Sequence, residues 1–549
     1  MKKLRAVIAV LVLAAVAALG LASCGGGSST SGGGGKEGGI LNATYKSFPD
    51  YMDPALSYTA EGWTAMGEVY IPLLTYKHAE GAEGGEVVPG LAKAMPKISN
   101  GGKTYTLFLR KGLKYSNGKP VKASDFTYAV ERCFKVNSGG SVFYTGIVGG
   151  EKFAETKTGG IPGIKTNDKT GEVKIELEKP RGTFTNELAL MFVAPVPPGT
   201  PNEDLSADPP PGTGPYMITN VQGKNSWEYK RNPYWAKANS KAMPEYPTGV
   251  VDGAKVTVVR NDETQVNDIE TGKYDWMENP PPASLYSQVK EKYEGSQFKI
   301  EPTISTYYFW MNTTKPPFDD LKVRQAVNYA IDPAALERIY SGQLKASHQV
   351  LPEGMPGRKS FDLYPHNMAK AKEMLEEANP SDKNITVWTD NESPNKEAGE
   401  YYEGVLKELG FSTKLKVINA DNYFTVIGNR STPDLDTGWS DWYEDYPHPN
   451  DFFQPLLAGE SILDTNNGNF AELDEADLNK EIAKLGEEQL GPEQEKRYAE
   501  LDKKYMELAP WAPYGQRTLN TFVSSAINLE NIVYNPTFFQ YLTSFEFNE

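Results

Sequence analysis

Two hydrophobic periodicities alternate along this 549-residue chain, and this alternation constrains the fold more than any other feature. Segments 103–110 and 172–178 carry apolar side chains at every second residue, as half-buried strands do. Segments 124–134 and 320–330 instead repeat apolar residues three and four positions apart, as amphipathic helices do. Strand and helix patterns that follow one another in this way predict mixed α/β lobes.

Residues with a capping preference mark several helix boundaries. Ser124 and Asp320 precede two of the helical patterns, and Asp332-Pro333 places an N-cap residue before a first-turn proline. Gly410 follows another helical pattern, and glycine at such a position favours the left-handed conformation that terminates helices.

The length predicts roughly two to four compact units, because a single hydrophobic core rarely grows this large. Proline and glycine cluster over 194–216, and three consecutive prolines follow Asn279. Such breaks are typical of crossings between lobes or of rigid surface turns, and composition alone does not distinguish the two.

The amino terminus has the pattern of an export signal. Three basic residues within the first five precede an apolar run from Ala6 to Leu21, which is short for a bilayer span. The run ends in Leu21-Ala22-Ser23-Cys24, which is similar to the bacterial lipobox, where the cysteine receives a diacylglycerol. We therefore expect a lipoprotein signal peptide over 1–23 and lipidation of Cys24. The alternative is a cleaved signal peptide whose cysteine is incidental.

Residues 24–38 are rich in glycine and serine and predict a flexible tether. A lipid chain contributes about 0.8 kcal/mol per buried methylene, so a diacylglycerol on Cys24 would hold the protein firmly. We expect a lipid-anchored protein of the cell envelope, on the extracytoplasmic face of the cell membrane.

The net charge argues against nucleic acid as a partner. It is −16 for the whole chain, and loss of residues 1–23 removes Lys2, Lys3 and Arg5 but no acid, which gives −19. A body this acidic repels phosphate backbones and anionic lipid surfaces.

Motifs for covalent or metal chemistry are absent from the sequence. It has no nucleophile elbow, no phosphate-binding glycine loop followed by Lys-Ser/Thr, and no HExxH. Its four histidines have no metal-ligand spacing. Cys133, the only cysteine after Cys24, shares a helical face with apolar residues, which predicts buried packing. We expect no cofactor, no metal site and no enzymatic activity.

The densest polar and aromatic stretch is 439–451, and three interpretations of it remain open. In an enzyme, Asp441, Glu444 or Asp445 would form a general acid/base pair. In a binding protein, one buried carboxylate would meet a ligand ammonium group between aromatic faces. A solvated acidic loop anchored by tryptophans is the third interpretation. Peptide capture would need such a carboxylate, because a charged terminus is costly to remove from water unless it is paired.

Six stretches together resemble extracellular solute-binding protein family 5, which contains the peptide- and nickel-binding components of ABC importers. They run in the expected order from about Gly39 to the end: Val69–Tyr76, Lys103–Phe126, Gly212–Tyr216, Arg231–Trp235, Asp319–Asp332 and Trp442–Pro447. Each motif alone is modest, but six in register are specific.

The resemblance implies an α/β, two-lobed periplasmic-binding-protein-like fold (type II, cluster C) with an extra subdomain in the first lobe. Lobe I would combine 39–75, 206–302 and 512–549, the inserted subdomain would cover 76–205, and lobe II would cover 303–511.

The resemblance also implies where a ligand would bind. Asp445 occupies the position whose carboxylate contacts the ligand amine in peptide-binding relatives. Further ligand-binding residues are expected beside it, after the first strand and after the crossing between lobes: Trp439, Trp442 and Tyr443; Tyr45; and Tyr307, Trp310 and Asn312.

The implied function is that of the substrate-binding component of an ABC importer. The protein, expected to be a monomer, would capture a small solute, a short peptide above all, between the lobes. It would then deliver the solute to the permease subunits in the membrane. The alternative within the same fold is an oligosaccharide, an opine or chelated nickel as ligand, and the remote alternative is a secreted hydrolase.

Overall fold

The computed structural model describes residues 37–549, except for the side chain of Asp421. The expected signal peptide, Cys24 and the expected tether up to residue 36 lie outside the described residues. Residues Glu37–Asn548 form one compact unit. Within 37–549, no helix combines the length and the apolar character needed to cross a bilayer.

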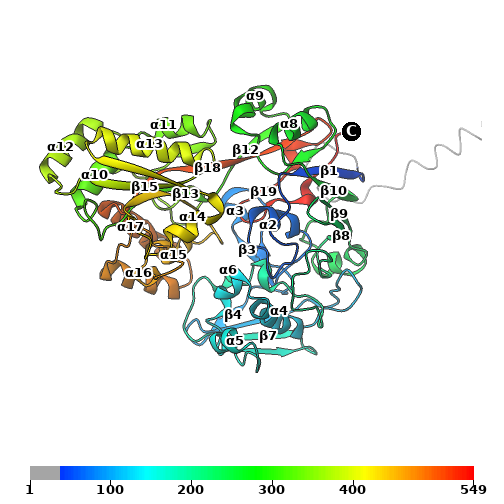
Figure 1. Ribbon diagram of the computed structural model, residues 1–549. Helices are drawn as coiled ribbons and strands as arrows, with labels where there is room; N and C mark the ends of the chain where they lie inside the picture. The colour runs from blue at the N-terminus through cyan, green and yellow to red at the C-terminus, as the bar shows by residue number, and fades with distance from the viewer. Residues whose placement is uncertain (1–36) are drawn as a thin grey trace, which may run out of the picture. The chain divides into compact units, whose positions relative to one another are not determined.

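A long strand, β18, joins two groups of strands into one 12-stranded sheet (Figure 1). Its residues up to Arg517 pair with β13 and β14, and its residues from Thr518 pair with β12 and β11. The chain passes between the two strand groups a second time from β12 to β13, which only Thr303 and Ile304 separate. The other passage is β18 itself. The strands are β11 (Trp276–Met277), β12 (Phe298–Pro302), β13 (Ser305–Met311), β14 (Leu344–Ala346) and β18 (Trp511–Val523).

The first strand group continues from β11 through β1 to β10, β9 and β8. The β11, β1 and β10 strands are parallel, whereas β9 and β8 are antiparallel to their neighbours. The elements of this part are β1 (Ile40–Tyr45), α2 (Ala60–Met66), β8 (Tyr216–Gln222), β9 (Ser226–Arg231), α7 (Ser240–Ala242), β10 (Gly253–Val258), α8 (Asp262–Glu270) and α9 (Ala283–Tyr293).

A separate four-stranded antiparallel sheet, in the order β4-β5-β7-β6, accompanies the helices α4, α5 and α6. Two further sheets contain two strands each, β2 with β3 and β19 with β20. Their elements are β2 (Leu74–Tyr76), α3 (Gly81–Gly84), β3 (Val87–Pro89), β4 (Lys97–Ser99), β5 (Thr104–Phe108), α4 (Ser124–Lys135), α5 (Gly150–Thr156), β6 (Ile164–Asn167), β7 (Glu172–Glu176), α6 (Phe184–Glu187), β19 (Tyr534–Asn535) and β20 (Phe539–Gln540).

The second strand group has the order β16-β15-β17-β13. Figure 1 shows α11 and α13 along one side of β15 and β13, with α15 and α16 on the other side. Its elements are α10 (Leu321–Ala330), α11 (Pro333–Ile339), α12 (Met368–Ala378), β15 (Asn384–Asp390), α13 (Asn395–Glu408), β16 (Ser412–Ile418), α14 (Ala420–Ile427), β17 (Thr437–Tyr443), α15 (Asn450–Leu457), α16 (Ala476–Glu487) and α17 (Pro492–Leu508).

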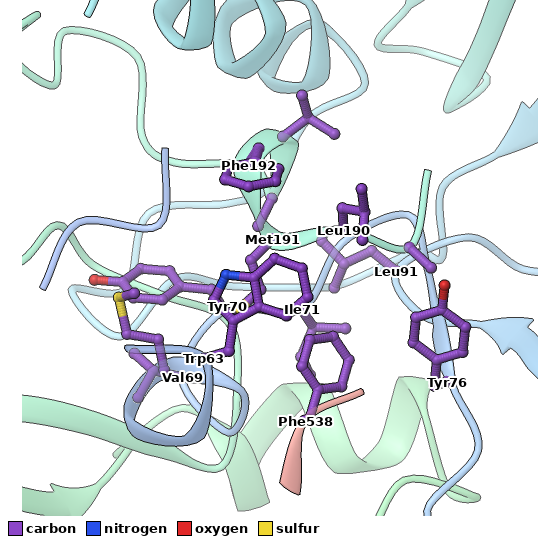
Figure 2. Packing of buried hydrophobic residues seen from close by; sticks show 14 of the residues in the cluster. Trp63, Val69, Tyr70, Ile71, Tyr76, Leu91, Leu190, Met191, Phe192 and Phe538 are labelled. Atoms are coloured by element: carbon purple, nitrogen blue, oxygen red, sulfur yellow. The ribbon is translucent and has the colours of Figure 1, made fainter. Parts of the chain in front are cut away.

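Buried apolar side chains form two large hydrophobic clusters and one small one. The first large cluster draws on 41–276, Tyr446 and 523–545, and the second lies within 304–514. In the first, Trp63, Ile71, Phe192 and Phe538 come from distant parts of the chain and pack together, as Figure 2 shows. The small cluster links α8, α9 and β12 to Phe522 of β18.

The expected strands and helices are confirmed at segments 103–110, 172–178, 124–134 and 320–330. Asp320 and Asp332 cap α10 and α11 through their side chains, and Gly410 has the left-handed conformation just after α13.

The expected N-cap role of Ser124 is wrong, because Ser124 already lies within α4 and its hydroxyl donates to Asp168. Cys133 is fully buried in the first hydrophobic cluster, as predicted, and burial raises the pKa of its thiol to about 12.

Candidate functional site

A cavity of about 660 Å³ is lined by residues from both large hydrophobic clusters, among them Trp63 of the first and Leu456 of the second. This volume suits a small organic ligand or a few amino-acid residues. Its lining is the segments Tyr58–Glu61, Glu278–Pro280 and Asp441–Asp445, together with Trp63, Phe424, Leu456, Gly468, Phe470, Leu519, Thr537 and Phe539.

Strand β17 and the residues after it supply the polar wall of this cavity. β17 pairs along its whole length with β13, from Thr437 to Tyr443. On its other edge it pairs with β15 only at Thr437 and Gly438. Beyond Gly438, that edge of β17 therefore has no strand partner in the described sheet.

The buried carboxylate of Asp451, at the start of α15, fixes the polar wall. Its Oδ2 accepts hydrogen bonds from the backbone N of Asp445 at 2.9 Å and from Nε1 of Trp442 at 3.2 Å. Burial raises the pKa of Asp451 well above its ordinary value, and the nearby Asp445 charge raises it further. Asp451 thus positions two cavity residues without lining the cavity itself.

Asp445 and Tyr58 lie beside each other in the cavity lining, close enough for their side chains to hydrogen-bond. Burial raises the pKa of the Asp445 carboxyl to about 6, and a hydrogen bond from Tyr58 partly opposes this shift. Tyr58 is held in place by Trp63, whose ring lies parallel to it at 6.1 Å, and by Phe192, whose ring meets it edge-on at 5.0 Å. A carboxylate and an aromatic wall thus meet where the two clusters approach each other.

A second acid, Asp441, lies on β17 opposite Tyr307 of β13. Burial raises the pKa of Asp441 to about 6, while a hydrogen bond from Tyr307 and the positive charge of Arg517 lower it. Tyr307 is itself hydrogen-bonded to the hydroxyl of Tyr443, at 3.0 Å. Asp441 and Tyr443 line the cavity, whereas Tyr307 and Arg517 stand behind them.

Comparison with known proteins identifies the family to which the chain belongs. The model of the bacterial extracellular solute-binding proteins, family 5 Middle, matches residues 86–463. The chain belongs to this family. This solute-binding protein is 25% identical in sequence to the oligopeptide-binding protein OppA of Bacillus subtilis (strain 168) over 461 residues, which cover 78% of each chain.

Two further relatives extend the comparison. This solute-binding protein is 27% identical over 405 residues to a dipeptide-binding protein of Escherichia coli (strain K12), which covers 68% of this chain and 70% of the relative. The solved structure of clavulanic acid biosynthesis oligopeptide binding protein 2 superposes with a TM-score of 0.85 at 22% identity, over 94% of this chain and 96% of that one. The fold is therefore the mixed α/β, two-lobed fold of these proteins.

Three of the predicted site residues of the solute-binding protein lie together at the cavity: Asp445, Trp442 and Tyr443. They come from one short stretch, the end of β17 and the turn before α15.

The other predicted site residues do not line the cavity. Trp439 is 2% exposed, and its Nε1 donates to the hydroxyl of Tyr514 at 2.9 Å. Tyr307 lies behind Tyr443, and Trp310 is buried within the second cluster. The remaining two are Asn312, whose side chain donates to the Leu435 carbonyl oxygen at 3.2 Å, and Tyr45, which packs edge-on against Trp227 at 4.9 Å.

Reasoning from the sequence missed half of the cavity of this solute-binding protein. The missed residues include Tyr58, Glu61 and Trp63 before and within α2, and Glu278 just before the run of prolines. The proline run was a visible signal, because its turn brings Glu278 and Asn279 to the cavity. For Tyr58 the only available signal was an acid between two aromatic residues, which is a common pattern.

Proposed function

We propose that this chain captures a short peptide in the cavity and delivers it to the membrane subunits of an ABC importer. The observation that carries the proposal is the Asp445 carboxylate. Asp451 holds the backbone N–H of Asp445 in an aromatic cavity, and the Asp445 carboxylate has no cation within ion-pair distance among residues 37–549. A terminal ammonium group would supply the missing charge. Relatives named as oligopeptide- and dipeptide-binding proteins support the peptide as the ligand.

The unpaired edge of β17 supports an extended peptide as the occupant. An extended chain can add to such an edge through main-chain hydrogen bonds, which are independent of its side chains. Trp442 and Tyr443 would then flank the first residues of the peptide, with Asp445 at its amino end. Among residues 37–549, no feature of the structure favours an oligosaccharide, an opine or chelated nickel over a peptide as the ligand, or a hydrolytic reaction over binding.

We further propose that the protein is a monomer anchored through Cys24 on the extracytoplasmic face of the membrane, with the Gly/Ser-rich residues after Cys24 as its tether. Lobe I would comprise 39–75, 206–302 and 512–549, with 76–205 inserted, and lobe II would comprise 303–511. The two large hydrophobic clusters support this division, since the second lies within 304–514 and the first, apart from Tyr446, lies outside that range. Family members are substrate-binding transport proteins, and the proposed role is likewise non-catalytic.

Mass spectrometry of the natively purified protein tests the peptide function. A cavity that removes a peptide from water retains it through purification, so we expect short peptides to be released on denaturation. Release of only sugars or metal chelates would reassign the ligand, and turnover of added peptides or glycans would support an enzyme.

Ligand binding is expected to make the protein more compact in solution. The two strand groups are joined through β18 and through the step from β12 to β13 at Thr303, so few backbone segments need to bend. A ligand that contacts both cavity walls favours the closed arrangement. Small-angle X-ray scattering should give a smaller radius of gyration with peptide than without it. Equal radii would contradict a hinge at this position.

Peptide affinity is expected to fall below pH 6. Asp445 must be ionised to pair with an ammonium group, and its pKa is about 6 in the ligand-free protein, where Tyr58, Glu444 and Asp451 face it. The carboxyl group is protonated below that value, so binding then requires loss of a proton. Calorimetry should show affinity that is about tenfold weaker at pH 5 than at pH 7. A flat profile over this range would argue against ionised Asp445 as the partner.

A further inference from the structure

The ionisable groups of the cavity lining are strongly biased toward acids. Apart from two tyrosine hydroxyls, they are the five carboxyl groups of Glu61, Glu278, Asp441, Glu444 and Asp445. Within residues 37–549, the lining contains no lysine, arginine or histidine. One carboxylate would be enough for the terminal ammonium group of a peptide, so four acids remain unexplained.

None of the five acids has a cation of its own. The ion pairs of the described residues, among them Lys46–Asp262 and Lys299–Glu80, leave all five without a partner within 4 Å. Arg517, which does not line the cavity, lowers the pKa of Asp441 through its positive charge. Glu278 and Glu444 experience no such charge.

Three buried polar atoms of the described cavity lining lack a hydrogen-bond partner, namely the Thr537 hydroxyl and two atoms that can only accept. Oε1 of Glu444 and Oδ1 of Asn279 are buried and accept no hydrogen bond, and both residues line the cavity. A buried acceptor without a donor costs about 1–3 kcal/mol. A bound group that donates hydrogen bonds would remove this cost, and a cation donates them most strongly.

The acids form two groups on different segments. Glu444 and Asp445 lie with Asp451 at the end of β17, whereas Glu278 lies near Glu61 beside the proline run. Burial raises the pKa of Glu278 well above its ordinary value, and the charge of Glu61 raises it further. Among residues 37–549, no three His, Cys, Asp or Glu side chains converge closely enough to hold a metal ion. Because Glu444 and Asp445 lie on one segment of the lining and Glu61 and Glu278 on others, the arrangement suits two separate cationic groups.

We propose that the cavity selects basic peptides, with the terminal ammonium group at Asp445 and a lysine or arginine side chain at Glu278 and Glu61. This inference rests on the proposed peptide function. The aromatic lining, which includes Trp63 and Phe539, would cover the methylene stem of the basic side chain while its charged end meets the carboxylates. Asn279 Oδ1 would accept one of its N–H groups.

Calorimetry on ligand-stripped protein tests the proposal with three peptides that differ at one position: Ala-Lys-Ala, Ala-(acetyl-lysine)-Ala and Ala-Glu-Ala. Acetyl-lysine keeps the length of lysine and removes its charge. We expect the lysine peptide to bind at least about tenfold more tightly than the acetyl-lysine peptide, and the glutamate peptide to bind most weakly of the three.

A variant pair locates the effect. In Glu278→Gln, the ratio between lysine and acetyl-lysine affinities should fall to about threefold or less. In Glu291→Gln, which changes an exposed acid on α9 away from the cavity lining, the ratio should be unchanged. Binding of all three peptides with equal affinity would overturn the charge preference and leave the peptide function standing. Binding of none of them, nor of longer peptides of the same series, would overturn both.

Discussion

Replacing Asp445 by asparagine is expected to weaken the binding of a peptide with a free amino terminus by roughly 30-fold or more. Asparagine keeps the shape of the side chain but leaves the ammonium group of the ligand in a cavity without its counter-charge. Removing one member of a buried, hydrogen-bonded charge pair costs about 2–5 kcal/mol. Calorimetry of wild type and variant with one peptide measures the difference.

The ligand-free Asp445→Asn variant should be no less stable than the wild type. Burial raises the pKa of Asp445 to about 6, above its ordinary value, so the ionised carboxylate opposes folding at neutral pH and its removal relieves that cost. Asp464→Asn is the matched control, since the side chain of Asp464 is 99% exposed and lies outside the cavity lining. Unchanged affinity in Asp445→Asn, or an equal loss in Asp464→Asn, would remove Asp445 from the binding site.

Replacing Arg132 by methionine is expected to lower the free energy of unfolding by about 3–5 kcal/mol. Arg132, on α4, is 1% exposed, and its two terminal nitrogens donate to the two carboxylate oxygens of Asp53 at 2.7 and 2.5 Å. Asp53 is fully buried, so loss of the guanidinium group leaves a carboxylate without a counter-ion in the protein interior. Denaturant unfolding followed by circular dichroism gives the change.

Two controls make this stability prediction specific. Lys135→Met, on the same helix, breaks the more exposed Lys135–Glu131 pair and should change the stability by less than about 1 kcal/mol. Adding Asp53→Asn to Arg132→Met should recover part of the loss, because it removes the uncompensated charge. A loss in Arg132→Met as small as that in Lys135→Met would show that the buried pair contributes little.

The fold could be predicted well where local patterns determine it. Tyr105 and Leu107 alternate on β5 and are both buried, and the aspartates before α10 and α11 cap these helices through their own side chains. Ser124 shows the limit of such patterns. Its partner is Asp168, which is 44 residues away in the sequence and not visible in any short window.

Some residues of the candidate site could likewise be predicted from local sequence, and others could not. Trp442, Tyr443 and Asp445 were predictable because the acid and the aromatic residues are neighbours in the sequence and end a strand at the cavity. Trp439 shares their stretch, but Tyr423 and Phe424 of α14 cover its ring, so it packs in the core.

The opposite wall could not be predicted, because Tyr58 and Glu278 meet β17 only through tertiary packing across more than a hundred residues of chain. Tyr45 was expected at the site because it follows the first strand, but Trp227 and Trp276 pack edge-on against its ring, which no short sequence window shows.

The central claim is that the cavity recognises a peptide by its terminal ammonium group, and the most direct measurement compares one peptide with its N-acetylated form. Calorimetry on ligand-stripped wild-type protein at pH 7 should show that the free-amine peptide binds at least about 30-fold more tightly. Equal affinities for the two forms would contradict the account.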